Sequence, residues 1–331
     1  MDILILCIVV FFALSFDFIN GFHDTANAIA TSVSTRALKP RVAILMAAVM
    51  NFLGAITFTG VAKTIGSGIA DPAQLENGTI IVIAALISAI AWNLITWWFG
   101  IPSSSSHALI GSLAGAVIAS AGFKAVNAGG FLDILKALLI SPLIAFTAGF
   151  IIMWILKKVL AKANPHRVNK GFRYGQVVTA MFQSFSHGTN DAQKAMGIIV
   201  FALVAADVQD TMDVPLWVKL SAALAMALGT SVGGWKIIKT MGTKIFKIEP
   251  VNGFAADVGS AVVILTATIL RLPVSTTHVI TSSILGVGSA KRFAAVKWGV
   301  AGRIVVAWVI TIPISVIMAA GVYWLIDLIF L

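Results

Sequence analysis

Residues 21–28 read Gly-Phe-His-Asp-Thr-Ala-Asn-Ala, and residues 188–195 read Gly-Thr-Asn-Asp-Ala-Gln-Lys-Ala. Both octapeptides share one frame: Gly, two variable positions, Asp, three variable positions and Ala. The second begins 167 residues after the first (188 − 21), which is close to half of the 331-residue chain. Each octapeptide lies between apolar blocks, where polar groups are not expected by chance. Two copies in one frame predict a duplicated fold organised around Asp24 and Asp191.

A second pair of matches supports the duplication. Residues 102–107 read Pro-Ser-Ser-Ser-Ser-His and residues 273–278 read Pro-Val-Ser-Thr-Thr-His, at an offset of 171 (273 − 102). The two kinds of match occur in the same order in each half of the chain. The expected organisation is a first repeat over residues 1–163, a basic cytoplasmic linker over 164–173 and a second repeat over 174–331.

The composition is that of a membrane protein. Hydrophobic residues make up 59% of the chain, charged residues make up 11%, and the mean hydropathy is +0.99. The chain contains about ten apolar runs of the length, roughly 20 residues, that crosses the hydrocarbon core as a helix. We therefore expect an all-α, multi-pass protein of the cell membrane. Its single cysteine, Cys7, excludes an internal disulfide and a metal cluster built on thiolates, and we expect no cofactor.

The basic residues indicate topology. Lys and Arg number 23 against 13 Asp and Glu, and they cluster between the apolar runs, as the positive-inside rule expects of cytoplasmic connections. We therefore expect no nucleic-acid partner. With the amino terminus outside, the chain reaches the basic segment 157–173 inside after an odd number of crossings, and the second half enters from the opposite face. This predicts an inverted-topology repeat, in which secondary transporters hold their substrate near the membrane midplane.

The two intramembrane acids, Asp24 and Asp191, need partners, because an ionised Asp at the centre of a membrane helix costs about 2.5–3.5 kcal/mol or more. Hydroxyl and amide oxygens beside a carboxylate suit a hard monovalent cation. The neighbouring residues that offer them are Thr25, Asn27, Thr189, Asn190 and Gln193. The alternative is a structural role, in which each carboxylate caps a broken helix. His23 adds an imidazole beside Asp24, a side chain that ordinarily titrates near neutral pH.

The hydroxyl clusters Ser103–Ser106 and Ser275–Thr277 follow prolines that suit a helix start. Hydroxyls and free N–H groups at a helix start bind anions, helped by the positive end of the helix dipole. Two converging clusters would surround a tetrahedral oxyanion with donors, whereas single clusters are ordinary caps or membrane packing. Three roles are open for Lys194: it could pair with Asp191, attract the anion, or extend its ammonium group to the membrane interface.

Other polar residues have several readings. Asp257 lies within an apolar run and is a candidate for a further cation. His107 and His278 each follow a hydroxyl cluster, where helix packing is favoured over proton transfer. A hydrolase is disfavoured, because Ser106 and His107 are neighbours and point about 100° apart on a helix, so the imidazole could not act as the base. We therefore expect a protein that is not an enzyme.

At these residues the sequence resembles the inorganic phosphate transporter (PiT) family, whose signature is a pair of Gly-x-Asn-Asp-x-x-x-Ala elements, one in each inverted half. The copy at 188–195 fits fully, and the copy at 21–28 has His23 where Asn is common. The resemblance extends from about residue 17 to about residue 302. It implies a polytopic symporter with about twelve membrane segments, including re-entrant helical hairpins, and a homodimer.

The resemblance also implies roles for residues at matching positions. Asp24, Asn27, Asn190 and Asp191 would bind cation and substrate. The phosphate site would be lined by Ser104, Ser105, Ser106, Ser275, Thr276 and Thr277, together with Gln193 and Lys194. From the octapeptides we add Thr25 and Asn27 to the phosphate ligands, and His23 and Asp257 to the candidate coupling residues.

These observations predict a secondary transporter that imports inorganic phosphate by symport with sodium ions. The oxygen-rich surroundings of the acids favour sodium. Proton-coupled transport of phosphate or of a metal-phosphate complex is the alternative, because His23 departs from the common pattern. Transport of another oxyanion, such as sulfate, is a second alternative.

Overall fold

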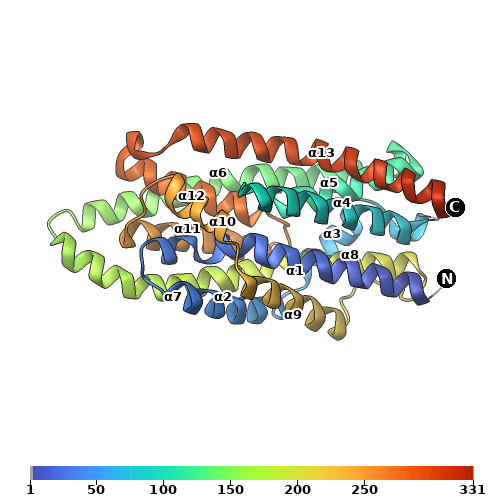
Figure 1. Cartoon of the computed structure of the whole chain (residues 1–331), viewed down its shortest axis with the longest axis horizontal. Coiled ribbons are helices and arrows are strands. Elements are labelled where there is room, and N and C mark those ends of the chain that lie inside the picture. Colours follow the sequence, from blue (N-terminus) through green and yellow to red (C-terminus); the bar gives the residue numbers. More distant parts are fainter. Residues whose placement is uncertain (1–2, 76, 331) are drawn as a thin grey trace.

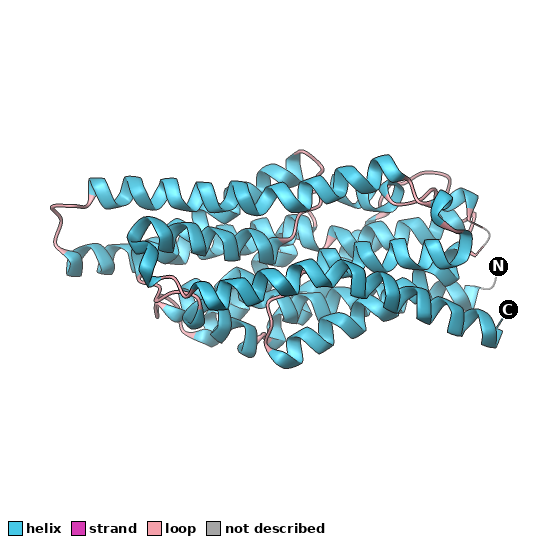
Figure 2. Ribbon diagram, turned by 90° about the horizontal axis from the view of Figure 1, so that it is seen from above, coloured by secondary structure: helices cyan, strands magenta, loops and turns pink. Residues whose placement is uncertain are grey.

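The fold was analysed in a computed structural model that describes residues 3–75 and 77–330. Within these residues the chain forms helices and no strand, which confirms the all-α prediction. Most helices lie along the long axis of the molecule (Figures 1 and 2). Their bounds are α1 Ile3–Ser34, α2 Pro40–Ala55, α3 Gly60–Gly68, α4 Gly78–Phe99, α5 Ser105–Ala121, α6 Ala128–Val159, α7 Pro165–Asp191, α8 Gln193–Ala205, α9 Leu216–Val232, α10 Trp235–Lys239, α11 Pro250–Ile269, α12 Thr276–Arg292 and α13 Trp298–Phe330.

Five of these helices, α1, α4, α6, α11 and α13, are long and apolar enough to cross a membrane. Two further pairs pass the same test together but are bent, α2 with the segment 60–74 by 72° and α9 with the segment 235–244 by 63°. The protein is therefore a multi-pass membrane protein of the cell membrane. The bent pairs have the geometry of broken spans or re-entrant hairpins, and the total of about twelve segments remains a prediction.

The same order of helices occurs in both halves. The long helix α1 corresponds to α7 and α8, α2 to α9, α3 to α10, α4 to α11, α5 to α12, and α6 to α13. Figure 1 shows both termini at one end of the long axis and the α6–α7 connection at the other. The helices α1 and α7 therefore begin at opposite ends. Most of the expected linker 164–173 is helical, with Asn164 capping the first turn of α7.

The first glycine of each octapeptide is explained by close helix packing. A Cβ atom on Gly21 would lie 2.9 Å from the backbone N of Thr230 in α9, and a Cβ on Gly188 would lie 2.7 Å from the Cα of Asn51 in α2. Small residues let membrane helices approach closely. These contacts pack α1 against α9 and α7 against α2, and so place Asp24 and Asp191, three residues later, in the interior of the protein.

Candidate functional site

The carboxylate of Asp24, on α1, contacts its neighbour His23 and side chains from two other helices, α5 and α12. Its Oδ1 lies 2.6 Å from Nδ1 of His23 and accepts a hydrogen bond of 3.3 Å from the hydroxyl of Thr277. Its Oδ2 accepts a hydrogen bond of 3.2 Å from the hydroxyl of Ser105. Asp24 and its three partners are buried. The nearby Thr96, on α4, lies 3.2 Å from His23 Nε2 and fixes the imidazole from its other side.

The carboxylate of Asp191 is the second centre. Its Oδ2 forms an ion pair of 2.8 Å with Lys194 Nζ, accepts a hydrogen bond of 3.3 Å from Asn20, and lies 3.5 Å from Nε2 of His187. Lys194 also donates a hydrogen bond of 3.0 Å to the Ser105 hydroxyl. Ser105 therefore connects the two acids, since its oxygen accepts from Lys194 while its proton goes to Asp24.

The starts of α5 and α12 supply the hydroxyls. Asn27 donates hydrogen bonds to Thr276 Oγ1 at 3.3 Å and to Thr277 Oγ1 at 2.9 Å. Ser105 begins α5 and Thr276 begins α12, so both hydroxyl groups stand where the first N–H groups of a helix have no intrahelical acceptor. Such helix starts attract anions. The two starts come from different halves of the chain and meet at the Asp24 carboxylate.

Three side chains at this centre have cation-ligand geometry. One ligand atom each from Asp24, His187 and Asp191 lies within 4.8 Å of the other two, and all three residues are buried. A single ion placed among them would contact both carboxylates. The cluster therefore combines a group that could hold a cation with hydroxyl-bearing helix starts.

The profile of a family described as phosphate transporters matches residues 20–319. The chain belongs to the phosphate transporter family. It is 60% identical over 333 residues to a probable low-affinity inorganic phosphate transporter of Bacillus subtilis, an alignment that covers 100% of both chains. It is 47% identical to a protein of the same description from Rhizobium meliloti, covering 96% of this chain and 95% of the relative.

A solved structure described as the sodium-dependent phosphate transporter superposes on this fold with a TM-score of 0.86. It is 28% identical in sequence, and the match covers 99% of this chain and 100% of that one. The resemblance drawn from the two octapeptides is thus confirmed. Because the family and these relatives are transporters, the prediction that this phosphate transporter family member is not an enzyme is confirmed as well.

Not every predicted site residue of the transporter points into the cluster. Asn190 donates to Thr268 and to the carbonyl of Leu272 and accepts from the backbone N of Val274, so it ties α7 to the α11–α12 connection. Gln193 accepts a hydrogen bond of 3.0 Å from the backbone N of Ala62 at the start of α3.

The remaining hydroxyls of the transporter's predicted site bond to backbone groups. Thr25 donates to the carbonyls of Gly21 and Thr230. Ser106 donates to the carbonyl of Val274, on the connection that leads into α12. Ser104 and Ser275 cap α5 and α12 and accept from backbone N–H groups at 3.1 and 3.3 Å. These residues hold the two helix starts in place.

Asp257 belongs to a second polar group, on α11. It accepts hydrogen bonds of 2.7 Å from Thr31 and 3.2 Å from Thr179. The histidines after the hydroxyl clusters pack together: the rings of His107 and His278 lie 4.4 Å apart, and His278 stacks on Trp308 at 3.9 Å. This agrees with the packing role expected for them.

Sequence reasoning missed two residues that contact Asp191, Asn20 and His187. Both contact Asp191, and both directly precede the glycine of an octapeptide, at the same offset of 167 (187 − 20). The signal was therefore present one residue before the quoted frame. Asn51 was missed too; it lies 3.0 Å from Nδ1 of His187 and orients that ring.

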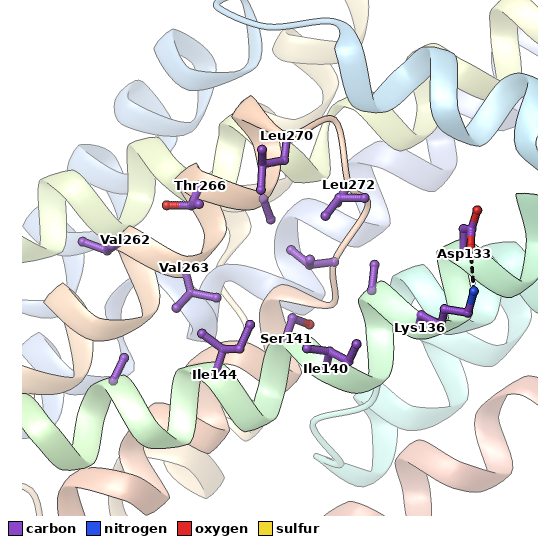
Figure 3. A pocket seen from close by; sticks show the side chains of 14 residues that line it. Asp133, Lys136, Ile140, Ser141, Ile144, Val262, Val263, Thr266, Leu270 and Leu272 are labelled. Atoms are coloured by element: carbon purple, nitrogen blue, oxygen red, sulfur yellow. Dashed lines mark hydrogen bonds and ion pairs between the residues drawn. The ribbon is translucent and has the colours of Figure 1, made fainter.

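A groove of the transporter with a volume of about 600 Å³ lies elsewhere. Figure 3 shows its lining of apolar side chains from α6 and α11, with the Asp133–Lys136 ion pair at one side. Ile140, Ile144 and Leu270 are exposed there. Such a largely apolar surface suits lipid tails rather than phosphate, so we do not assign the substrate site to this groove.

Proposed function

We propose that the protein imports inorganic phosphate across the cell membrane by symport with sodium ions. One observation carries the proposal: the Asp24 carboxylate binds hydroxyls from both helix starts, Ser105 of α5 and Thr277 of α12. A group that could hold a cation thus competes for the donors that an oxyanion would need. Membership in the phosphate transporter family supports phosphate as that oxyanion, and the sodium-dependent structural neighbour supports sodium as the cation.

For phosphate, we propose a site at the two helix starts. Ser105, Thr276 and Thr277 would donate to the phosphate oxygens together with free backbone N–H groups, and Lys194 would supply the positive charge. The supporting contacts are those of Asn27, which orients both threonine hydroxyls. Thr25, Ser104, Ser106, Gln193 and Ser275 hold the helices around the site through the backbone hydrogen bonds described above.

For sodium, we propose Asp24 and Asp191 as the charged ligands and Asn27 as an amide ligand, while Asn190 holds α7 to the α11–α12 connection beside them. The Oδ1 atom of Asn27 has no hydrogen-bond donor within the described part of the chain and is free to bind an ion. Asp257, with its two threonine donors, is proposed as a further cation-binding residue on the same transport path.

Coupling follows from the single proton that each hydroxyl can donate. While Ser105 and Thr277 donate to Asp24, they cannot donate to phosphate. A sodium ion on Asp24 would neutralise the carboxylate and release both hydroxyls to the substrate. By linkage, phosphate then raises the affinity for sodium by the same factor. A dianion would also be repelled by two unneutralised carboxylates, so the cation is expected to bind first.

For the architecture, we propose two inverted repeats over residues 1–163 and 174–331, joined by the basic cytoplasmic segment 164–173, with about twelve membrane segments and a homodimeric assembly. The repeated order of helices and the opposite starting ends of α1 and α7 support the inversion (Figure 1). The two bent helix pairs support re-entrant hairpins. The dimer rests on the family resemblance, and light scattering of the detergent complex tests it.

The second candidate is proton-coupled phosphate transport. The contact of 2.6 Å between His23 Nδ1 and Asp24 Oδ1 favours it, because a proton shared by this pair would neutralise the same carboxylate. The deciding experiment is uptake of radiolabelled phosphate by proteoliposomes under an imposed sodium gradient or an imposed proton gradient. Accumulation under sodium alone supports the proposal, and accumulation under protons alone replaces sodium by the His23–Asp24 pair. Competition by unlabelled sulfate in a further arm tests the identity of the oxyanion.

A further inference from the structure

Asp17, on α1, is a buried acid that the mechanism above does not use. Its side chain is fully enclosed, with 0% of the residue exposed. Neither of its carboxylate oxygens has a hydrogen-bond donor among the described residues. A buried ionised carboxylate without a donor is costly, because water no longer solvates the charge. The buried charge of Asp17 therefore needs a compensating ligand or a structural explanation. The position of Asp17 in the fold favours a ligand.

Asp17 is the end of a polar stripe on α1. The stripe repeats every three or four residues, which puts its members on one face of the helix. All of them are buried: Asp17, Asn20, Asp24, Asn27 and Thr31. At its Asn20 end the stripe lies against α7, since Asn20 donates to Asp191 at 3.3 Å. Further along α1 its side chains contact α5, α12 and α11. Asp17 thus extends the proposed substrate site by two turns towards the amino-terminal end of α1.

Asp17 has further unpartnered oxygens on its own side of the site. Oδ1 of Asn20, one turn away on the same face, has no donor in the described structure, and Oδ1 of Asp191 has none either. Asp191 and Lys194 lie close enough to act on Asp17 electrostatically. These three residues, Asp17, Asn20 and Asp191, therefore have four buried acceptor oxygens to which no described group donates a hydrogen bond. Carboxylate and amide oxygens of this kind suit a hard monovalent cation.

The charges lead to the same conclusion. Three buried carboxylates, Asp17, Asp24 and Asp191, act on this region, and Lys194 is the buried ammonium among the described residues that opposes them. One cation at the Asp24–Asp191 group still leaves Asp17 without compensation when the histidines are neutral. The corresponding position in the second half is Ser184 (17 + 167), so the extra acid has no symmetric counterpart.

We propose that Asp17, Asn20 and Asp191 form a second sodium site, adjacent to the group of Asp24, His187 and Asp191 but separate from it. The proposal rests on the sodium symport proposed above and adds a residue outside both octapeptides to its machinery. A sodium ion there would bind the unshared Oδ1 of Asp191, while Oδ2 keeps its contacts with Lys194 and Asn20. It would neutralise Asp17 and lower the repulsion that phosphate meets on entering.

The test is direct sodium binding to the purified full-length protein in detergent, without phosphate, by isothermal titration and by sodium-dependent thermal shift. Asp17→Asn, of nearly equal shape, should weaken one class of sodium site about tenfold or more, as expected for loss of a charged ligand. Without sodium the variant should melt at a higher temperature than the wild type, because an uncompensated buried charge is gone. Ser184→Ala, at the equivalent buried position, should change neither result.

Unchanged sodium binding in Asp17→Asn would overturn the proposal, and so would a fall in melting temperature without sodium. Asn20→Ala provides a second variant that leaves every charge in place and should weaken the same class of site by a smaller factor. The symport proposal fails separately, through absence of sodium-driven phosphate uptake by wild-type proteoliposomes. Sodium-driven uptake with intact sodium binding in Asp17→Asn would leave the symport in place and reject this site alone.

Discussion

The hydroxyl of Ser105 lies 3.2 Å from the Asp24 carboxylate, although 81 residues separate the two along the chain. On its other side the same hydroxyl oxygen accepts a hydrogen bond from Lys194. A residue of the first hydroxyl cluster thus touches the acid of the first octapeptide and the ammonium of the second. The Ser105 hydroxyl therefore belongs to the proposed anion site and also contacts the proposed cation site. This shared contact is the physical basis for coupling between phosphate binding and cation binding.

The Thr277 hydroxyl should affect phosphate more than the fold. Thr277→Val preserves shape but removes the donor, so we expect the phosphate concentration for half-maximal uptake to rise roughly tenfold, the effect of one strong hydrogen bond. Thr277→Ser should keep nearly wild-type uptake. A matched control is Thr147→Val, since the exposed Thr147 on α6 bonds only its own helix. Equal behaviour of the two valine variants would contradict the proposed site.

The Asp24 carboxylate should link sodium to phosphate. In Asp24→Asn the hydroxyls no longer face a negative charge, so phosphate binding should lose most of its dependence on sodium, and concentrative uptake should stop. The measurement is phosphate binding to detergent-purified protein across a range of sodium concentrations. Asp133→Asn, which removes an exposed acid on α6, should keep the wild-type sodium dependence. Persistent dependence in Asp24→Asn would remove this residue from the sodium site.

The Lys194–Asp191 pair should be strongly coupled. Lys194→Met leaves a buried carboxylate without its ammonium, so the free energy of unfolding should fall by about 3–5 kcal/mol. Adding Asp191→Asn to the same protein removes the unpaired charge and should recover most of that stability. Phosphate uptake should be absent in Lys194→Met and in the double variant. Thermal melting and uptake of both single variants and the double variant give the coupling. If the stability losses of the two single variants simply add in the double variant, Lys194 and Asp191 are not coupled energetically and the predicted ion pair is contradicted.

The glycine of the second octapeptide should be a packing residue. Gly188→Ala places a methyl group against the backbone of Asn51, a contact that helix movement must relieve, so we expect a loss of about 1–3 kcal/mol. Gly171→Ala, also on α7, meets no atom within 4 Å and should stabilise the helix by up to about 1 kcal/mol. Melting temperatures in detergent test both expectations. A Gly188→Ala protein of unchanged stability would show that α2 and α7 are not packed as described.

The amino-acid sequence by itself determined the class and the centre of this protein. Its apolar runs leave no surface for a soluble fold, and the two octapeptides singled out Asp24 and Asp191 because buried acids need partners. The hydroxyl clusters after Pro102 and Pro273 marked two helix starts, since local capping depends on neighbouring residues. Family membership followed from the same residues.

Only the tertiary structure decided which polar groups meet. Asn190 and Gln193 belong to the octapeptides, yet they bond the α11–α12 connection and α3, whereas Asn20 and His187, outside both frames, contact Asp191. A frame of eight residues specifies spacing along a helix but not the direction from which another helix arrives. That direction depends on long-range packing at positions such as Gly21 and Gly188. Only the tertiary structure shows that Asp17 is buried with no hydrogen-bond donor among the described residues.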